Sequence, residues 1–254
     1  CNKNNSIALA YKRTMRKSTS CGGASILLVM QQHHSSQTAD SICHEYLDSI
    51  KKPHLLHRIS KRFFDLFFSF VGIVIISPVF LAVLILQWMT TPGTPFFKQE
   101  RIGKGGKPFH IIKFRTMELN AEADGPQLVN TTNSTRFTRC GQFLRKHHLD
   151  ELPQLWNVLV GEMSFVGYRP ERAYFIKQIM ERDNRYALLY TTRPGITSEA
   201  AIYNGYTDTI DKMLRRLEMD LDYQNRLSLW TDLKIIFATA VVFFTGRQDA
   251  SQNS

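Results

Sequence analysis

Cysteine is scarce in this chain and does not cluster. Its 254 residues contain four cysteines, with no CxxC pair and no histidine at the spacing of a zinc ligand. We therefore expect neither a disulfide framework nor a zinc site, and the composition fits a reducing compartment. The length fits one ordinary domain with accessory segments.

Acidic residues are also in deficit. The chain has 22 Asp and Glu against 32 Lys and Arg, a net charge of +10. This excess predicts an anionic partner, which is phospholipid, nucleotide or nucleic acid. Because no basic motif is interleaved with aromatic residues, we expect no nucleic-acid partner. An anionic membrane surface accounts for the charge instead.

Sustained apolar periodicity is missing from residues 1–50, which are rich in Ser, Thr, Asn and Gln. We interpret them as a poorly ordered polar tail with one short strand at 26–30.

Charge is missing from one long segment, residues 66–89, whose 24 residues are enough for a transmembrane helix. Ser77 and Pro78 lie at its midpoint, and proline removes a backbone donor and clashes with the preceding turn. Each half then spans roughly 16–18 Å, well short of the ~30 Å hydrocarbon core. Basic residues flank both ends, namely Lys51, Lys52, Arg58, Lys61, Arg62, Lys98, Arg101, Lys104 and Lys107.

The positive-inside tendency places both flanks on the cytoplasmic side. We therefore predict that residues 51–92 form a basic amphipathic entry and a re-entrant membrane helix, broken at Ser77 and Pro78. The Ser77 hydroxyl is a candidate donor to the carbonyls that Pro78 frees. Asp65 lies one turn from Lys61 and Arg62, so an ion pair is expected there. The alternative is a kinked helix that crosses the membrane.

Residues 93–247 are predicted to form a compact α+β catalytic domain. Strand-like runs at 96–102 and 109–114 flank the glycine-rich turn 103–107, which indicates a β-hairpin. The basic tip of this hairpin either binds a phosphate or is an ordinary turn.

The rest of this region has helical patterns at 171–190 and 207–226, where we expect most charges to be solvated, and a turn at 193–197. The apolar run 233–244 is too short to span a bilayer. It should lie in the membrane interface or join the core.

Two adjacent carboxylates, Asp150 and Glu151, begin a short predicted helix that contains Gln154 and Asn157 on the face of Asp150. With Asp150 as the N-cap, Pro153 falls in the first turn, which leaves the Asp150 carboxylate less committed to capping. Such carboxylates can hold a divalent metal, and one can attack phosphorus. The alternative is an acidic first turn with surface salt bridges.

Cations surround this pair, as phosphoryl-transfer chemistry requires. Lys113 and Arg115 alternate with apolar residues, so we expect both on one face of their strand. The other basic candidates for binding phosphate are Arg139, Arg145 and Arg169.

These motifs together resemble the bacterial sugar transferases, the monotopic phosphoglycosyl transferases that act on undecaprenyl phosphate. The matching blocks are Lys61-Arg62-Phe63-Phe64-Asp65, Ser77-Pro78, Phe97-Lys98-Gln99-Glu100-Arg101-Ile102-Gly103, Lys113-Phe114-Arg115-Thr116-Met117, Thr138-Arg139 with Gly141, Leu149-Asp150-Glu151-Leu152-Pro153-Gln154-Leu155-Trp156-Asn157-Val158, Gly161-Glu162-Met163-Ser164, Arg169-Pro170 and Pro194-Gly195-Ile196-Thr197.

The resemblance implies transfer of a sugar-1-phosphate from a UDP-sugar to polyprenyl phosphate, with release of UMP and with Mg²⁺ as cofactor. It implies that Asp150 is the nucleophile, that a phosphosugar-aspartate forms, and that Glu151 binds the metal with Asp150. The nearby cations would offset phosphate charge. The implied location is the cytoplasmic face of the bacterial inner membrane, at the first membrane step of exopolysaccharide, capsule, O-antigen or glycoprotein glycan assembly. Downstream glycosyltransferases are then possible partners.

The sequence departs from the family pattern at three places. Tyr168 replaces the usual Pro before Arg169-Pro170, residues 198–201 replace Gly-Trp-Ala-Gln, and His147-His148 replaces a small polar pair. These changes bear on the identity of the donor sugar. They also leave a second hypothesis, a catalytically silent membrane-bound scaffold that binds nucleotide-sugar.

Overall fold

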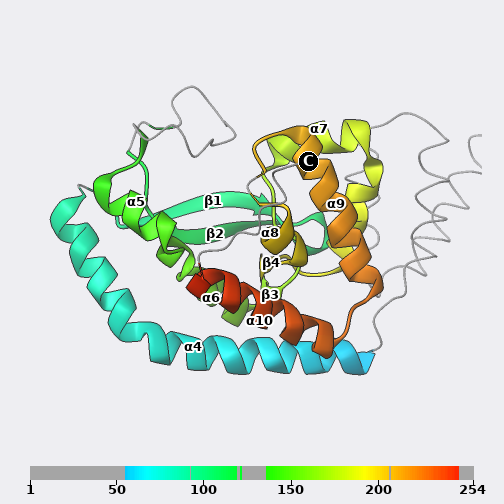
Figure 1. Cartoon of the computed structure of the whole chain (residues 1–254), viewed down its shortest axis with the longest axis horizontal. Helices are drawn as coiled ribbons and strands as arrows, with labels where there is room; N and C mark the ends of the chain where they lie inside the picture. Colours follow the sequence, from blue (N-terminus) through cyan, green and yellow to red (C-terminus); the bar gives the residue numbers. More distant parts are fainter. Residues whose placement is uncertain (1–54, 92, 119–120, 122–135, 206, 246–254) are drawn as a thin grey trace, which may run out of the picture.

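The computed structural model describes residues 55–91, 93–118, 121, 136–205 and 207–245. The predicted tail and the short strand at 26–30 lie outside the described residues. The described part contains both helices and strands, which confirms the predicted mixture of helix and strand (Figure 1).

The α-helices are α4 (Leu55–Thr90), α5 (Arg139–Lys146), α6 (Gln154–Val160), α7 (Ala173–Arg182), α8 (Glu199–Tyr203), α9 (Ile210–Asn225) and α10 (Leu229–Thr245). Short 3-10 helices cover Lys104–Gly106, Leu149–Glu151 and Asn184–Thr191. The strands are β1 (Phe96–Ile102), β2 (Pro108–Phe114), β3 (Ser164–Val166) and β4 (Gly195–Thr197).

Helix α4 runs along one whole side of the molecule and is bent (Figure 1). It contains one proline, Pro78, and the Ser77 hydroxyl donates to the Val74 carbonyl at 2.8 Å. That carbonyl is the acceptor that the missing amide of Pro78 would have used. The expected role of Ser77 is therefore confirmed, while the expected break is a bend within one continuous helix. By length and composition α4 is able to cross a membrane.

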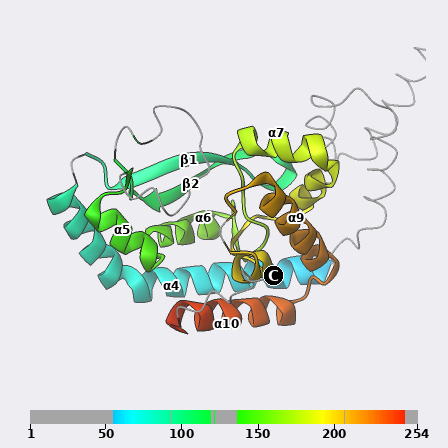
Figure 2. The same ribbon diagram turned by 45° about the horizontal axis from the view of Figure 1, so that its top comes forward.

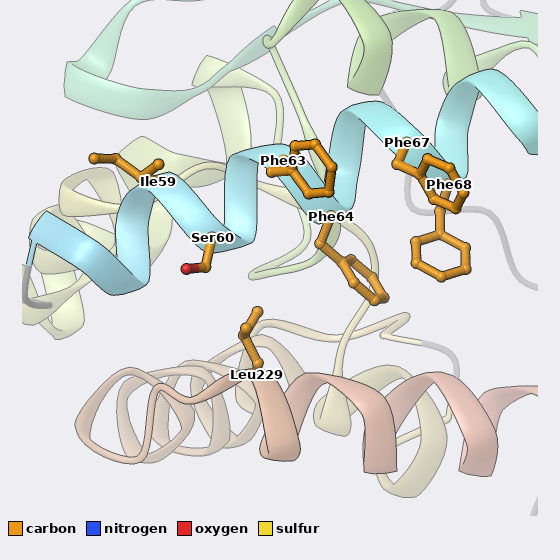
Figure 3. A pocket seen from close by; sticks show the side chains of 7 residues that line it. All are labelled: Ile59, Ser60, Phe63, Phe64, Phe67, Phe68 and Leu229. Atoms are coloured by element: carbon orange, nitrogen blue, oxygen red, sulfur yellow. The ribbon is translucent and has the colours of Figure 1, made fainter.

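Most of the apolar surface of α4 points away from the protein. Trp88 is 82% exposed and Phe63 is 70% exposed, a pattern that marks a surface made for contact with protein or membrane. A shallow apolar pocket lies between α4 and α10, where Phe64 and Ser60 point toward Leu229 (Figure 3). The outward face of α4 therefore supports a membrane anchor.

Helix α10 lies alongside α4 in both views (Figures 1 and 2). Ile235 is buried against Val166 and Ile202, whereas Leu233 and Phe237 are exposed. The apolar run at 233–244 therefore joins the core on one side and presents apolar surface on the other.

The predicted β-hairpin is confirmed: β1 and β2 pair antiparallel, with Phe96 opposite Phe114 and Ile102 opposite Pro108. The expected turn at 193–197 is wrong in part, because β4 pairs in parallel with the distant β3. A Cβ atom at Gly195 would lie 2.2 Å from the Gly167 nitrogen, so this close approach requires glycine.

The expectation of mostly solvated charges in the helical regions is wrong at three residues. Glu171 is buried and pairs with Arg101 at 3.1 Å and with buried Arg216. Asp220 is also buried, and burial raises its pKa to about 7. Charges are tolerated here because the two arginines compensate Glu171.

The expected ion pair of Asp65 with Lys61 or Arg62 is also replaced by other contacts. Asp65 accepts hydrogen bonds from the Ser164 hydroxyl at 3.0 Å and the Phe165 amide at 3.1 Å. Lys61 instead pairs with Asp232 of α10 at 2.5 Å. Asp65 bonds to β3 and not to its neighbours on the helix, because α4 packs against the folded domain.

Gly141 is expected to be intolerant of any side chain. A Cβ atom there would lie 2.0 Å from the Thr116 carbonyl oxygen. Gly141→Ala should therefore lower the free energy of unfolding by about 1–3 kcal/mol through overpacking, measured by denaturation of the detergent-solubilised protein. Gly72→Ala is the control, because its Cβ would meet Leu155 at an ordinary 3.6 Å within a helix. Equal destabilisation by the two changes would contradict the steric explanation.

Candidate active site

The acidic pair lies in the 3-10 helix Leu149–Glu151, immediately before α6. His148 precedes it in the left-handed region with φ of 51°. The cap position of α6 is Pro153, so the expectation that Asp150 caps this helix is wrong. The local 3-10 turn places both carboxylates ahead of α6, where neither is used as its cap.

Asp150 is buried, with 8% of its surface exposed, and its Oδ1 atom has no hydrogen-bond partner among the described residues. Burial raises the pKa of this carboxyl, and the charges of Lys113 and Arg145 act in the opposite direction. An uncommitted carboxylate oxygen in a partly desolvated setting is suited to nucleophilic attack.

Glu151 sits between two cations. Its Oε1 atom lies 2.5 Å from Lys113 Nζ and 3.6 Å from Arg169 Nη2. Burial opposes ionisation, but the two cations lower the pKa of Glu151 well below its usual range. Glu151 is therefore ionised at neutral pH.

The two cations come from different segments of the chain. Lys113 lies near the end of β2, and Arg169 follows β3, with 42% of its side chain exposed. Arg101 of β1 donates to the Pro170 carbonyl at 3.1 Å and also pairs with Glu171. These contacts fix the backbone next to Arg169.

The remaining predicted cations are less closely gathered. Arg145 has its guanidinium 4.9 Å from the centroid of the Phe137 ring, and its charge lowers the pKa of Asp150. Arg139 is the exposed first residue of α5. Arg115 is buried, and its guanidinium packs close to Gly93. A Cβ atom at that glycine would lie 3.1 Å from Arg115 Nη1.

The expected common strand face of Lys113 and Arg115 stays a prediction, since Arg115 lies just beyond the strand. Strand β2 ends at Phe114, so Arg115 leaves the strand. Its carbonyl accepts a hydrogen bond from Gln87 of α4 at 2.7 Å. The alternation of apolar and basic residues in the sequence does not indicate where the strand ends.

Asn157 is engaged with the hairpin. Its Oδ1 accepts from the Ile112 amide at 3.1 Å, and its Nδ2 donates to the His110 carbonyl at 2.8 Å and to Glu162 at 2.7 Å. Gln154 is also buried, but its Nε2 atom lacks a partner within the described part of the chain. Asn157 thus holds α6 on β2, and Gln154 retains a free donor.

His148 is a site residue that the sequence reasoning did not select. It lies next to the acidic pair, and in its protonated form it would contribute a small part of the charge that lowers the pKa of Asp150 and Glu151. The available signal was its position directly before Leu149 and the acidic pair.

The acidic pair offers Mg²⁺ few protein ligands. In the described ranges, no group of three or more His, Cys, Asp or Glu side chains is placed to hold a metal. Mg²⁺ is often held by one or two carboxylates together with substrate phosphates. The free Oδ1 of Asp150 and the ionised Glu151 fit an ion shared with a phosphate, although Glu151 is already paired with Lys113.

The family model described as bacterial sugar transferase matches residues 56–246, and the chain belongs to this family. The UDP-N-acetylgalactosamine-undecaprenyl-phosphate N-acetylgalactosaminephosphotransferase of Aeromonas hydrophila is 37% identical over 194 residues, covering 76% of this chain and 46% of that protein.

Two further relatives carry one name, UDP-glucose:undecaprenyl-phosphate glucose-1-phosphate transferase. That of Escherichia coli (strain K12) is 39% identical over 194 residues, 76% of this chain and 42% of the relative. That of Caulobacter vibrioides is 37% identical over 196 residues, 76% of this chain and 73% of the relative. The chain thus spans less than half the length of the Aeromonas and Escherichia proteins.

Proposed function

We propose that the protein is a phosphoglycosyl transferase that moves a sugar-1-phosphate from a UDP-sugar to polyprenyl phosphate and releases UMP. The observation that carries this proposal is the buried Asp150, with a free carboxylate oxygen, beside an ionised Glu151 and the cations Lys113 and Arg169. The names of the relatives, which specify undecaprenyl phosphate and UDP-sugars, support the substrate classes.

In the first step, an Asp150 oxygen attacks the phosphorus that carries the sugar. An oxygen–phosphorus bond forms, the bond to the bridging oxygen of the diphosphate breaks, and UMP leaves with that oxygen and its electron pair. In the second step, a phosphate oxygen of the polyprenyl phosphate attacks the same phosphorus and the Asp150 carboxylate leaves. Splitting the transfer in this way avoids bringing two anionic substrates together at once.

Lys113, Arg145 and Arg169 offset the charge that develops on the phosphoryl oxygens. When Mg²⁺ is bound, Glu151 and Asp150 would hold it, and it would supply further neutralisation of the diphosphate. The free amide of Gln154 is available to a substrate oxygen. Arg115 and Arg139 contribute more weakly to the binding of phosphate, from a greater distance.

In this proposal the enzyme works at the cytoplasmic face of the bacterial inner membrane, and α4 is re-entrant. The basic residues on both flanks of α4 and its bend at a single proline support this topology. A glycosyltransferase that extends a lipid-linked sugar would consume the product, in assembly of an exopolysaccharide or a related glycan.

Pro78→Leu is expected to change this topology. Restoring the amide at residue 78 should straighten α4 and favour spanning, because a straight 36-residue helix is about 54 Å long. We would measure the accessibility of single cysteines placed at residue 56, at the start of α4, and at residue 94, after its end, to an impermeant thiol reagent in oriented vesicles. Both sites should react from one side before the change and from opposite sides after it. Unchanged accessibility would contradict the topology.

The function is tested by UMP release from the detergent-solubilised protein with Mg²⁺, undecaprenyl phosphate and a panel of UDP-sugars. Release with one donor, dependent on the lipid phosphate, is the expected result. Binding of a UDP-sugar by folded protein without UMP release would favour the scaffold hypothesis.

A further inference from the structure

The N-terminal part of α4 contacts helix α6 and strand β3, the segments next to the acidic pair and Arg169. Arg62 donates from Nη1 to the Val158 carbonyl at 2.7 Å and from Nη2 to the Leu159 carbonyl at 2.8 Å. Both carbonyls belong to the last turn of α6, which cannot satisfy all of its acceptors internally. Gly161 ends α6 with φ of 93°, and a Cβ atom there would lie 3.1 Å from the Arg62 guanidinium. Glycine therefore leaves the space that Arg62 occupies.

The same turn of α4 also holds β3. Asp65, which is 1% exposed, accepts from the Ser164 hydroxyl and the Phe165 amide. Three residues after the end of β3, Arg169 lies 3.6 Å from Glu151. Asp65 thus holds the strand that leads directly to a cation of the site.

Arg62 and Asp65 therefore act on the two segments that meet at the acidic pair. Only the turn residues Leu152 and Pro153 separate the 3-10 helix of Glu151 from α6, so a shift of α6 moves that helix. A shift of β3 moves Arg169. One face of α4 thus fixes both sides of the ion pair between Glu151 and Arg169. Lys61 of the same helix forms an ion pair with Asp232 of α10.

We propose that Arg62 and Asp65 are positioning residues that set the geometry of the acidic pair against Arg169. The membrane helix is then part of the catalytic framework as well as an anchor. This inference rests on the proposed transferase activity for its kinetic test. Its structural test is independent of that activity.

Two pairs of variants separate positioning from simple stabilisation. Arg62→Met removes both hydrogen bonds to α6, whereas Arg62→Lys keeps the charge but cannot serve two carbonyls in the same fork geometry. Asp65→Leu removes the acceptor for β3, whereas Asp65→Asn keeps an acceptor oxygen. Arg58→Met is the matched control, because Arg58 is an exposed cation one turn earlier on α4.

The measurements are kcat and KM for UMP release per folded molecule, together with hydrogen exchange of the amides at 149–161 and 164–169. We expect Arg62→Met and Asp65→Leu to lower kcat about 10- to 100-fold, since small misplacements of reacting groups have effects of this size. KM for the UDP-sugar should change less than about threefold. Exchange should become faster at 149–161 in the Arg62 variant and at 164–169 in the Asp65 variant. Asp65→Asn should retain most turnover.

Unchanged kcat and unchanged exchange in the folded variants would overturn the proposal. So would an equal loss of kcat in Arg58→Met. If the unaltered protein releases no UMP, the proposed function fails, and hydrogen exchange alone decides the positioning role. If Arg62→Met does not fold, Arg62→Lys must show faster exchange at 149–161, and unchanged exchange there overturns the proposal.

Discussion

Asp150→Asn is expected to abolish UMP release, with a loss of turnover of at least about 10³-fold, because loss of a nucleophile removes the covalent route altogether. The amide matches the carboxylate in shape, so the buried site should still fold. The measurement is UMP release together with trapping of radiolabelled sugar phosphate on the protein. Neither turnover nor trapped label should be detected.

Asp183→Asn is the matched control, because it makes the same change at a residue that caps the 3-10 helix Asn184–Thr191 and pairs with Arg185, away from the acidic pair. It should retain turnover per folded molecule. Full turnover in Asp150→Asn would exclude Asp150 as the nucleophile. Turnover lost in both variants would point to a folding effect.

Lys113→Met is expected to move the acidic limb of the pH–rate profile to higher pH. Lys113 lowers the pKa of both Asp150 and Glu151, so removing its charge raises both pKa values. A protonated Asp150 cannot attack phosphorus, and activity is lost as the pH falls through its pKa. Because that pKa rises in the variant, activity is lost at a higher pH than in the unaltered enzyme. At neutral pH we also expect a fall in kcat of about 10²-fold from lost charge stabilisation.

The measurement is kcat for UMP release between about pH 5 and 9, a range chosen around neutrality for a carboxylate whose pKa is raised. Lys113→Arg retains the charge and should keep its acidic limb near the original position. Lys98→Met is the control on the same hairpin, since Lys98 is exposed on β1. An acidic limb that does not move in Lys113→Met would contradict the electrostatic role of this lysine.

The local features of the fold were predictable because their causes lie within a few residues. Alternating apolar residues and a glycine-rich turn specified the β1–β2 hairpin, and Ser77 next to Pro78 specified the hydroxyl that bonds the freed carbonyl. The acidic pair was also recognisable, because two adjacent carboxylates among basic blocks form a short continuous motif.

The errors arose where partners are distant in the chain. Asp65 was expected to pair with its helix neighbours, yet it bonds Ser164 and Phe165 of β3. Glu171 was expected in solvent, yet Arg101 and Arg216 bury it. Spacing along a helix gives the nearest candidate partner, but packing of separate elements decides which candidate is reached.

By itself, the sequence determined the long apolar helix, the hairpin, the family and the acidic pair, since each depends on a run of neighbouring residues. Only the tertiary structure decided that Lys113 and Arg169 meet at Glu151, and that the Arg115 carbonyl accepts a hydrogen bond from Gln87 of α4. Only it decided that Arg62 and Asp65 of α4 bond to α6 and β3. The reason is physical: hydrogen bonds and ion pairs act over about 3–4 Å, and only folding brings these distant segments within that range.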